Sequence, residues 1–151
     1  DTEITHAIRA PEVSEWASKV SQYPLVRAGL LNLQRRLGEG PEGAVAEGRD
    51  IGTVVFPNAE VKIFLTADPQ ARAERRVAQL AEKGTQVTVA EILNDMKVRD
   101  ERDSQRSTAP LVKADDATEI DSTRVTMEQV ISKIIQMVHS CQSTNGETAH
   151  G

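Results

Sequence analysis

Cysteine is nearly absent from this chain of 151 residues, because Cys141 has no second cysteine with which to pair. An intramolecular disulfide is therefore excluded. No segment has the basic, apolar and small-residue order of a secretory signal, so we expect a cytoplasmic protein. Long apolar runs are missing as well, since none approaches the roughly 20 residues that a transmembrane helix needs. The sequence therefore predicts no membrane association.

Aromatic side chains and positive charge are also scarce. Trp16, Tyr23, Phe56 and Phe64 are the only aromatic residues, and the formal net charge is -5. A nucleic-acid-binding surface needs positive charge to meet the phosphate backbone and aromatic side chains on which bases can stack. We therefore expect no nucleic-acid partner, and a core built from aliphatic side chains.

Metal-ligating residues form no convincing site in the sequence. His139, Cys141 and His150 lie near the chain end, where a predicted helix runs into a polar tail. We interpret them as ordinary surface residues and predict no metal site.

The periodicity of apolar residues predicts an α/β fold with a mainly parallel sheet flanked by helices. The chain length of 151 residues is typical of one domain. The tail over residues 140–151 is small and polar, and we expect it to be disordered. Helices are predicted over residues 11–21, 24–37, 69–83, 89–106 and 126–138, and strands over 44–46, 61–66 and 119–121.

A glycine-bracketed loop follows the first predicted strand. Arg49 and Asp50 lie between Gly48 and Gly52 and precede the apolar run 54–56. Open α/β sheets bind their ligands beyond the carboxyl ends of their strands. The Arg49-Asp50 pair is therefore a candidate binding site.

A second charged set lies on a predicted helix. Arg99, Asp103 and Arg106 have i, i+4 and i+7 spacing, which places them within an arc of roughly 60°. Guanidinium groups bind phosphate oxygens bidentately, and a carboxylate accepts hydrogen bonds from sugar hydroxyls. The residue types alone would equally suit an exposed helix face with i,i+4 ion pairs.

The distribution of charge favours phosphate binding over an exposed ion-pair face. Residues 72–106 contain eight basic and seven acidic side chains, although the whole chain is acidic. Arg72, Arg75 and Arg76 are grouped on one helical turn. An arginine-rich segment can neutralise a transferring phosphoryl group.

Taken together, the motifs resemble the bacterial cytidylate kinases in order and spacing from about residue 6 to 139. The resemblance rests on Ile8-Arg9, Ser18, Tyr23 to Arg27, Gly48 to Pro57, Lys62 to Leu65, Arg99 to Asp103 with Arg106, Ala109 to Leu111 and Ile120 to Ser122. It implies transfer of the γ-phosphoryl group of ATP to CMP or dCMP with Mg²⁺, on a nucleoside monophosphate kinase-like fold.

The resemblance also implies a role for each candidate residue. Ser18, Arg27 and Asp50 would bind cytosine, and Arg99 and Asp103 would bind the sugar hydroxyls. Arg49 and Arg106 would bind the acceptor phosphate and serve in catalysis. Residues 1–139 would form the core portion, with a lid over about 69–108. Arg72, Arg75 and Arg76 would lie on the ATP side of that lid.

The phosphate-binding motif G-x-x-x-x-G-K-[ST] occurs nowhere in the chain. The family carries this P-loop on its first strand, so we interpret the chain as a C-terminal portion with an incomplete sheet. We expect little or no kinase turnover, and association with itself or with the missing N-terminal segment. Two alternatives stay open: a non-catalytic module that binds nucleoside monophosphates, and a related kinase for another acceptor.

Overall fold

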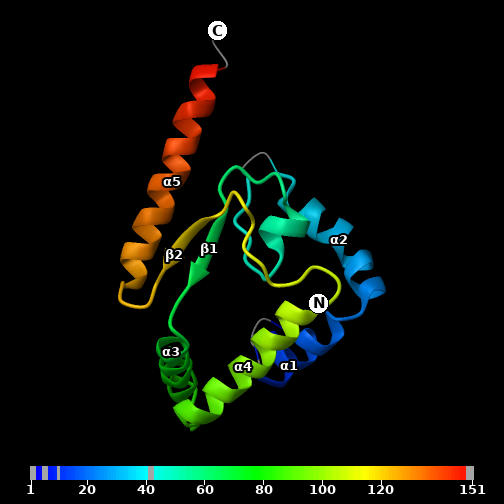
Figure 1. The fold of residues 1–151 in the computed structure, drawn as a ribbon, viewed down its shortest axis with the longest axis vertical. Coiled ribbons are helices and arrows are strands. Elements are labelled where there is room, and N and C mark those ends of the chain that lie inside the picture. The colour runs from blue at the N-terminus through cyan, green and yellow to red at the C-terminus, as the bar shows by residue number, and fades with distance from the viewer. Residues whose placement is uncertain (1–2, 5–6, 10, 41–42, 149–151) are drawn as a thin grey trace. The chain divides into compact units, whose positions relative to one another are not determined.

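The computed structural model describes residues 3–4, 7–9, 11–40 and 43–148. The chain divides into two compact units. The first unit combines Asp1–Phe56 with Val98–Val112, and the second combines Pro57–Lys97 with Lys113–Gly151. Figure 1 shows the order of the elements along the chain.

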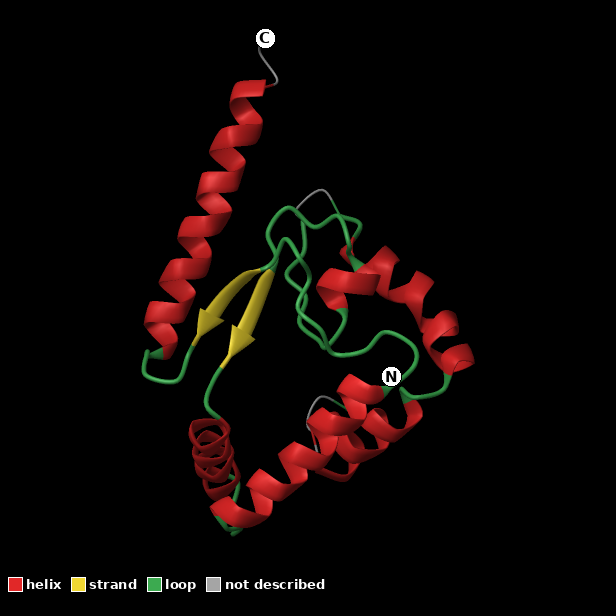
Figure 2. Cartoon of the chain, viewed as in Figure 1, coloured by secondary structure: helices red, strands yellow, loops and turns green. Residues whose placement is uncertain are grey.

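The second unit contains a small parallel sheet (Figure 2). Strand β1 (Ile63–Thr66) pairs with strand β2 (Thr118–Asp121), in a register that aligns the first residue of each strand and the last. Ile120 is buried, whereas its neighbours in β2 are exposed. The predicted α/β fold with a parallel sheet is confirmed, and both of these strands lie where the apolar runs placed them.

Helix α3 (Pro69–Glu82) follows β1 in the second unit. Asp68 caps its first turn, since the carboxylate accepts hydrogen bonds from the backbone N–H groups of Gln70 at 2.8 Å and Ala71 at 3.3 Å. Ala73 and Leu80, two turns apart on one face, are buried. Ile120 is the other buried apolar residue among the described residues of this unit. The helix predicted over 69–83 is confirmed.

Helix α5 (Met127–Thr148) extends beyond its predicted end. The sequence placed that end near residue 138 and predicted disorder from 140. The predicted end is wrong, because the helix continues to Thr148. The disorder stays a prediction. The hydroxyls of Ser140 and Ser143 donate to the carbonyls of Gln136 and His139, each at 2.9 Å. A polar composition without proline therefore does not end this helix. Residues 149–151, including His150, lie outside the described residues.

The first unit is built from helices. Helix α1 (Pro11–Val20) follows a 3₁₀ turn, η1 (Ala7–Arg9), and helix α2 (Pro24–Gly38) follows α1. Helix α4 (Val89–Gln105) contributes its C-terminal residues from Val98 onward to this unit. All three helices agree with the predicted ranges to within a residue at each end.

Residues 44–46 form no strand, contrary to prediction. They are exposed and irregular, and Gly43 just before them has a φ of +73°. A three-residue apolar run has no partner strand here among the described residues, so its backbone gains nothing from an extended form. The Arg49-Asp50 pair therefore does not lie between two strands.

Residues Ile51–Val55 form a single π-helical turn, η2, where the sequence showed only an apolar run. The N–H of Val55 donates to the carbonyl of Asp50 at 3.2 Å, and the N–H of Phe56 donates to that of Ile51 at 2.7 Å. Single π-helical turns are frequent at functional sites. This one begins directly after Asp50.

Helix α2 holds η2 in place through polar and apolar contacts. Arg35 donates hydrogen bonds to the carbonyls of Val54 at 2.9 Å and Val55 at 3.0 Å. A Cβ on Gly38 would lie 2.4 Å from Cζ of Phe56, so only glycine allows the ring to approach this closely. Because Asp50 directly precedes η2, these contacts between α2 and η2 also fix the position of Asp50.

Within the part of the chain that the structure describes, no helix is both long and apolar enough to cross a lipid bilayer.

Candidate functional site

Asp50 lies at the start of η2 and is 8% exposed. Arg27, in the first turn of α2, donates from Nη2 to its Oδ2. Nη2 of Arg106 lies 3.7 Å from the other carboxylate oxygen, Oδ1. An ion pair thus joins Asp50 to Arg27, which is 23 positions away in the sequence, and Arg106 lies close by.

Asp103 on α4 is the most deeply buried carboxylate among the described residues of the first unit, with a side chain 3% exposed. Nε of Arg49 lies 3.2 Å from its Oδ2. Nε of Arg99 lies 3.8 Å from the same oxygen, and Nη1 of Arg106 lies 3.9 Å from Oδ1. The predicted common helix face of Arg99, Asp103 and Arg106 is therefore real, because i,i+3 and i,i+4 side chains are neighbours.

Arg106 joins the two buried carboxylates. It lies just beyond the end of α4, and its side chain is 5% exposed. Its Nε donates to the carbonyl of Ala109, which has a φ of +51°, while the N–H of Leu111 donates to the carbonyl of Asp103 at 2.9 Å. This tight turn holds Arg106 against Asp50 and Asp103, so both carboxylates belong to one site.

The charge of Arg106 is incompletely compensated. Burial lowers the pKa of Arg106 below its ordinary value, and the nearby charge of Arg27 acts in the same direction, while Asp50 and Asp103 oppose the shift. Its buried Nη2 has no hydrogen-bond partner in the described structure. A buried donor of this kind is rare and costly unless a ligand completes it.

Arg49 has two carboxylate partners on α4. Besides Asp103, it contacts Asp100, whose Oδ1 accepts a hydrogen bond from Nη1 at 2.8 Å. The Arg49 and Asp100 side chains are 28% and 27% exposed. Sequence reasoning assigned no role of its own to Asp100. Its position three residues before Asp103 is the signal that could have identified it.

Ser18 on α1 is buried and lies against α4. Its hydroxyl donates to Oδ1 of Asp103 at 3.4 Å and accepts from Nη1 of Arg102 at 3.2 Å. Ser18 therefore connects two helices as well as lying at the site. Arg102 was missed by sequence reasoning, since its partner is 84 positions away.

The three arginines predicted for the lid are on α3, in the second unit. Arg75 donates from Nη1 to the hydroxyl of Ser122 at 3.1 Å, and from Nη2 to the carbonyls of Ser122 and Thr123. Ser122 is buried and donates in turn to the carbonyl of Thr66 at 2.9 Å. Arg75 thus ties α3 to the carboxyl ends of both strands. Arg72 and Arg76 lie on the same helix.

We name the charged set of the first unit the Arg-Asp cluster. It contains four arginines and three aspartates, a formal excess of one positive charge: Arg27, Arg49, Asp50, Arg99, Asp100, Asp103 and Arg106. A mostly buried site with excess guanidinium charge favours an anion with several acceptor oxygens.

The donor set of the Arg-Asp cluster does not fit Mg²⁺. Its three carboxylates all lie against guanidinium groups. Among the residues that the structure describes, no group of three His, Cys, Asp or Glu side chains is arranged to hold a metal ion. We therefore assign no step at this cluster to a protein-held metal.

A small parallel sheet, flanking helices and a buried Arg-Asp cluster define an α/β protein with part of a nucleoside monophosphate kinase-like fold. Its closer affiliation follows from sequence comparison. The model of the family described as Cytidylate kinase matches residues 1–140, and the chain belongs to that family.

Curated bacterial relatives carry the same description. The chain is 51% identical over 134 residues to a cytidylate kinase of Enterobacter sp. (strain 638), an alignment that covers 89% of this chain and 59% of the relative. A cytidylate kinase of Colwellia psychrerythraea is 48% identical over 136 residues, covering 90% and 60%. One of Pseudomonas savastanoi pv. phaseolicola is 49% identical, covering 90% and 59%. The chain thus spans about three fifths of their length.

Proposed function

We propose that this chain forms the acceptor-binding part of a cytidylate kinase, which transfers the γ-phosphoryl group of ATP to CMP or dCMP. The family membership supports a kinase. The observation that carries the acceptor site is the Arg-Asp cluster, in which the buried Nη2 of Arg106 has no hydrogen-bond partner among the described residues. Because a phosphate oxygen would complete that donor, the cluster suits a mononucleotide.

The base is recognised by Asp50 in this proposal. Cytosine has an exocyclic amino group that donates hydrogen bonds, whereas uracil has a carbonyl oxygen at the same position. A buried carboxylate accepts from the amino group and repels the carbonyl. Arg27 holds Asp50 in position through their ion pair, and can itself donate to the ring nitrogen or carbonyl of cytosine. Ser18, whose hydroxyl contacts Asp103 and Arg102, is the third residue that we propose to bind cytosine.

The phosphate is bound by Arg49 and Arg106 in this proposal. Both guanidinium groups lie against Asp103, so they share one region of the site. During phosphoryl transfer they would neutralise negative charge on the acceptor phosphate, which is the main way that such enzymes lower the barrier. Arg99 and Asp103 would bind the sugar hydroxyls.

The proposal also includes ATP and Mg²⁺. The carboxylates of the cluster are engaged by arginines, so we propose that Mg²⁺ arrives bound to the phosphates of ATP. Arg72 and Arg76 are the arginines of α3 that we propose for the ATP side. We expect these 151 residues by themselves to bind CMP. Because the chain contains no P-loop motif, we expect them to catalyse little or no transfer.

The experiment that tests acceptor binding is calorimetric titration of the chain with CMP and UMP. We expect CMP to bind at least about tenfold more tightly, because a buried carboxylate left facing a carbonyl oxygen is penalised. Asp50→Asn should reduce that preference to near unity, since its amide can donate to uracil. Asp95→Asn changes an exposed aspartate on α4 and is the matched control.

The possible results separate the alternatives. Equal affinity of the unmodified chain for CMP and UMP would contradict base reading by Asp50. Tighter binding of AMP than of CMP would indicate a kinase for another acceptor. Absence of binding to any nucleoside monophosphate would overturn the proposed acceptor site as a whole.

A further inference from the structure

We propose that Asp100 is a positioning residue that orients Arg49 toward the phosphate of the acceptor. Neither the family resemblance nor the helix spacing assigned a role to Asp100. The inference rests on the proposed function, because it needs Arg49 to bind that phosphate.

Two carboxylates hold the guanidinium of Arg49 at different nitrogen atoms. Nη1 donates to Asp100 at 2.8 Å, and Nε lies 3.2 Å from Asp103. Because a guanidinium is rigid and planar, contacts at two of its nitrogens set both its position and the direction of its plane. The third nitrogen, Nη2, makes no hydrogen bond within the described residues and is the donor left for a ligand.

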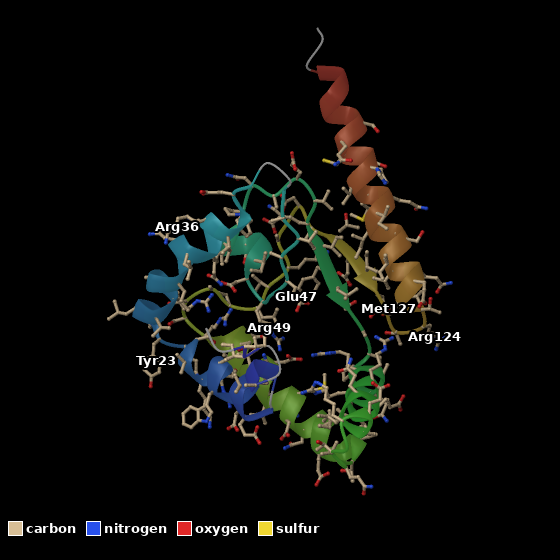
Figure 3. All side chains as sticks on the ribbon, turned by 180° about the vertical axis from the view of Figure 1, so that it is seen from behind. Tyr23, Arg36, Glu47, Arg49, Arg124 and Met127 are labelled. Atoms are coloured by element: carbon tan, nitrogen blue, oxygen red, sulfur yellow. The ribbon has the colours of Figure 1, made fainter. Side chains whose placement is uncertain are left out.

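The backbone around Arg49 gives it little support of its own. Residues 43–47 have no regular structure, and Arg49 lies in the irregular segment between them and η2. Figure 3 labels Arg49, whose side chain comes from this segment. A long side chain on such a segment has many rotamers, so its orientation must come from α4. Asp103 alone would leave the guanidinium free to rotate about its single contact.

Asp100 is better suited to orienting Arg49 than to attracting the ligand. Its own negative charge opposes binding of a phosphate, so a purely electrostatic effect would make its removal beneficial. If Asp100 orients Arg49, its removal should instead weaken phosphate binding, because a misplaced guanidinium binds phosphate less well. The direction of the change in affinity therefore distinguishes the two.

The experiment is an NMR titration of the 151-residue chain with CMP and with cytidine, which has no phosphate. Three variants are compared: Asp100→Ala, Asp100→Asn and the exposed control Asp95→Ala. The Nε–Hε resonance of Arg49 is followed as a direct report on its mobility.

We expect Asp100→Ala to weaken CMP binding about tenfold, the usual loss for a charge-assisted hydrogen bond, with cytidine binding unchanged. Asp100→Asn keeps an oxygen acceptor for Nη1, so CMP binding should stay within about threefold of the unmodified chain. The Arg49 resonance should broaden or exchange faster in Asp100→Ala only. Asp95→Ala should match the unmodified chain.

Several results would overturn the inference while leaving the proposed function intact. One is CMP binding by Asp100→Ala that is as tight as, or tighter than, that of the unmodified chain. Another is an equal loss of CMP and cytidine binding in both Asp100 variants, which would indicate a general structural role. If the unmodified chain bound neither ligand, the proposed function itself would fail, and this inference with it.

Discussion

The two units use arginine side chains in different ways. In the second unit, Arg75 donates to Ser122 and Thr123, and Ser122 donates to Thr66, so these polar groups satisfy one another. In the first unit, Arg106 is buried against two carboxylates, and its Nη2 still lacks a hydrogen-bond partner in the described structure.

From this difference we expect Arg75 to support the fold and Arg106 to be available to a ligand. The contacts of Arg75 are neutral carbonyl and hydroxyl oxygens at the ends of strands, which a ligand has no reason to displace. Arg106 and Arg49 lie among carboxylates with an excess of positive charge, an arrangement that an anion would complete. We therefore expect the same residue type to have different roles in the two units.

Loss of the buried carboxylate of Asp103 should have the largest effect on stability. We expect Asp103→Asn to lower the free energy of unfolding by about 3 kcal/mol, because Arg49, Arg99 and Arg106 would be left crowded together. Urea denaturation followed by circular dichroism measures this value. The exposed Asp95→Asn should stay within about 0.5 kcal/mol of the unmodified chain. Equal effects of the two variants would contradict the central position of Asp103.

Loss of Arg75 should have a smaller effect on stability and none on acceptor binding. Arg75→Ala removes hydrogen bonds to Ser122 and Thr123, so we expect a loss of about 1 to 2 kcal/mol in the free energy of unfolding. Arg76→Ala, on the next residue of α3, should cost less. A calorimetric titration should give the same affinity for CMP in both variants. Weaker CMP binding in Arg75→Ala would mean that the contrast between the units is wrong.

The smallest expected effect is on the pKa of Asp121, the last residue of β2. The hydroxyl of Thr123, which donates to Asp121 at 2.5 Å, lowers the pKa of that carboxyl below its ordinary value of 3.8, and the Thr123 N–H adds to the shift. The associated stabilisation is complete above the ordinary pKa and is lost as pH falls through the lowered one.

Thr123→Val removes the hydroxyl donor and should raise the pKa of Asp121 toward its ordinary value. An NMR titration of the carboxyl carbon measures this change. Thr123→Ser keeps the hydroxyl and should leave the pKa low. An unchanged pKa in Thr123→Val would show that the hydroxyl does not act on Asp121.

Much of the local structure was predictable from the sequence, because the relevant contacts are between near neighbours. Asp68 and Pro69 marked the start of α3, and the i,i+3 and i,i+4 spacing around Asp103 placed Arg99 and Arg106 beside it. The predictions that failed were the strand over 44–46 and the end of α5. Both depended on what surrounds the segment rather than on its composition.

The roles of individual charged residues within the site were less predictable. Arg27, Arg49, Asp50 and Arg106 were identified as candidates, but Asp100 and Arg102 were not. Their partners, Arg49 and Ser18, lie 51 and 84 positions away. Nothing in the spacing of charges on one helix indicates which of them will meet a side chain from so distant a segment.

By itself, the sequence determined the helices, the two paired strands and the common face of Arg99, Asp103 and Arg106, because backbone geometry acts over three or four residues. Only the tertiary structure decided that Asp50 and Asp103 share Arg106, that Asp100 holds Arg49 and that Arg75 supports the strand ends. The physical reason is that hydrogen bonds and ion pairs depend on distance in space, and folding alone brings distant parts of the chain within reach of one another.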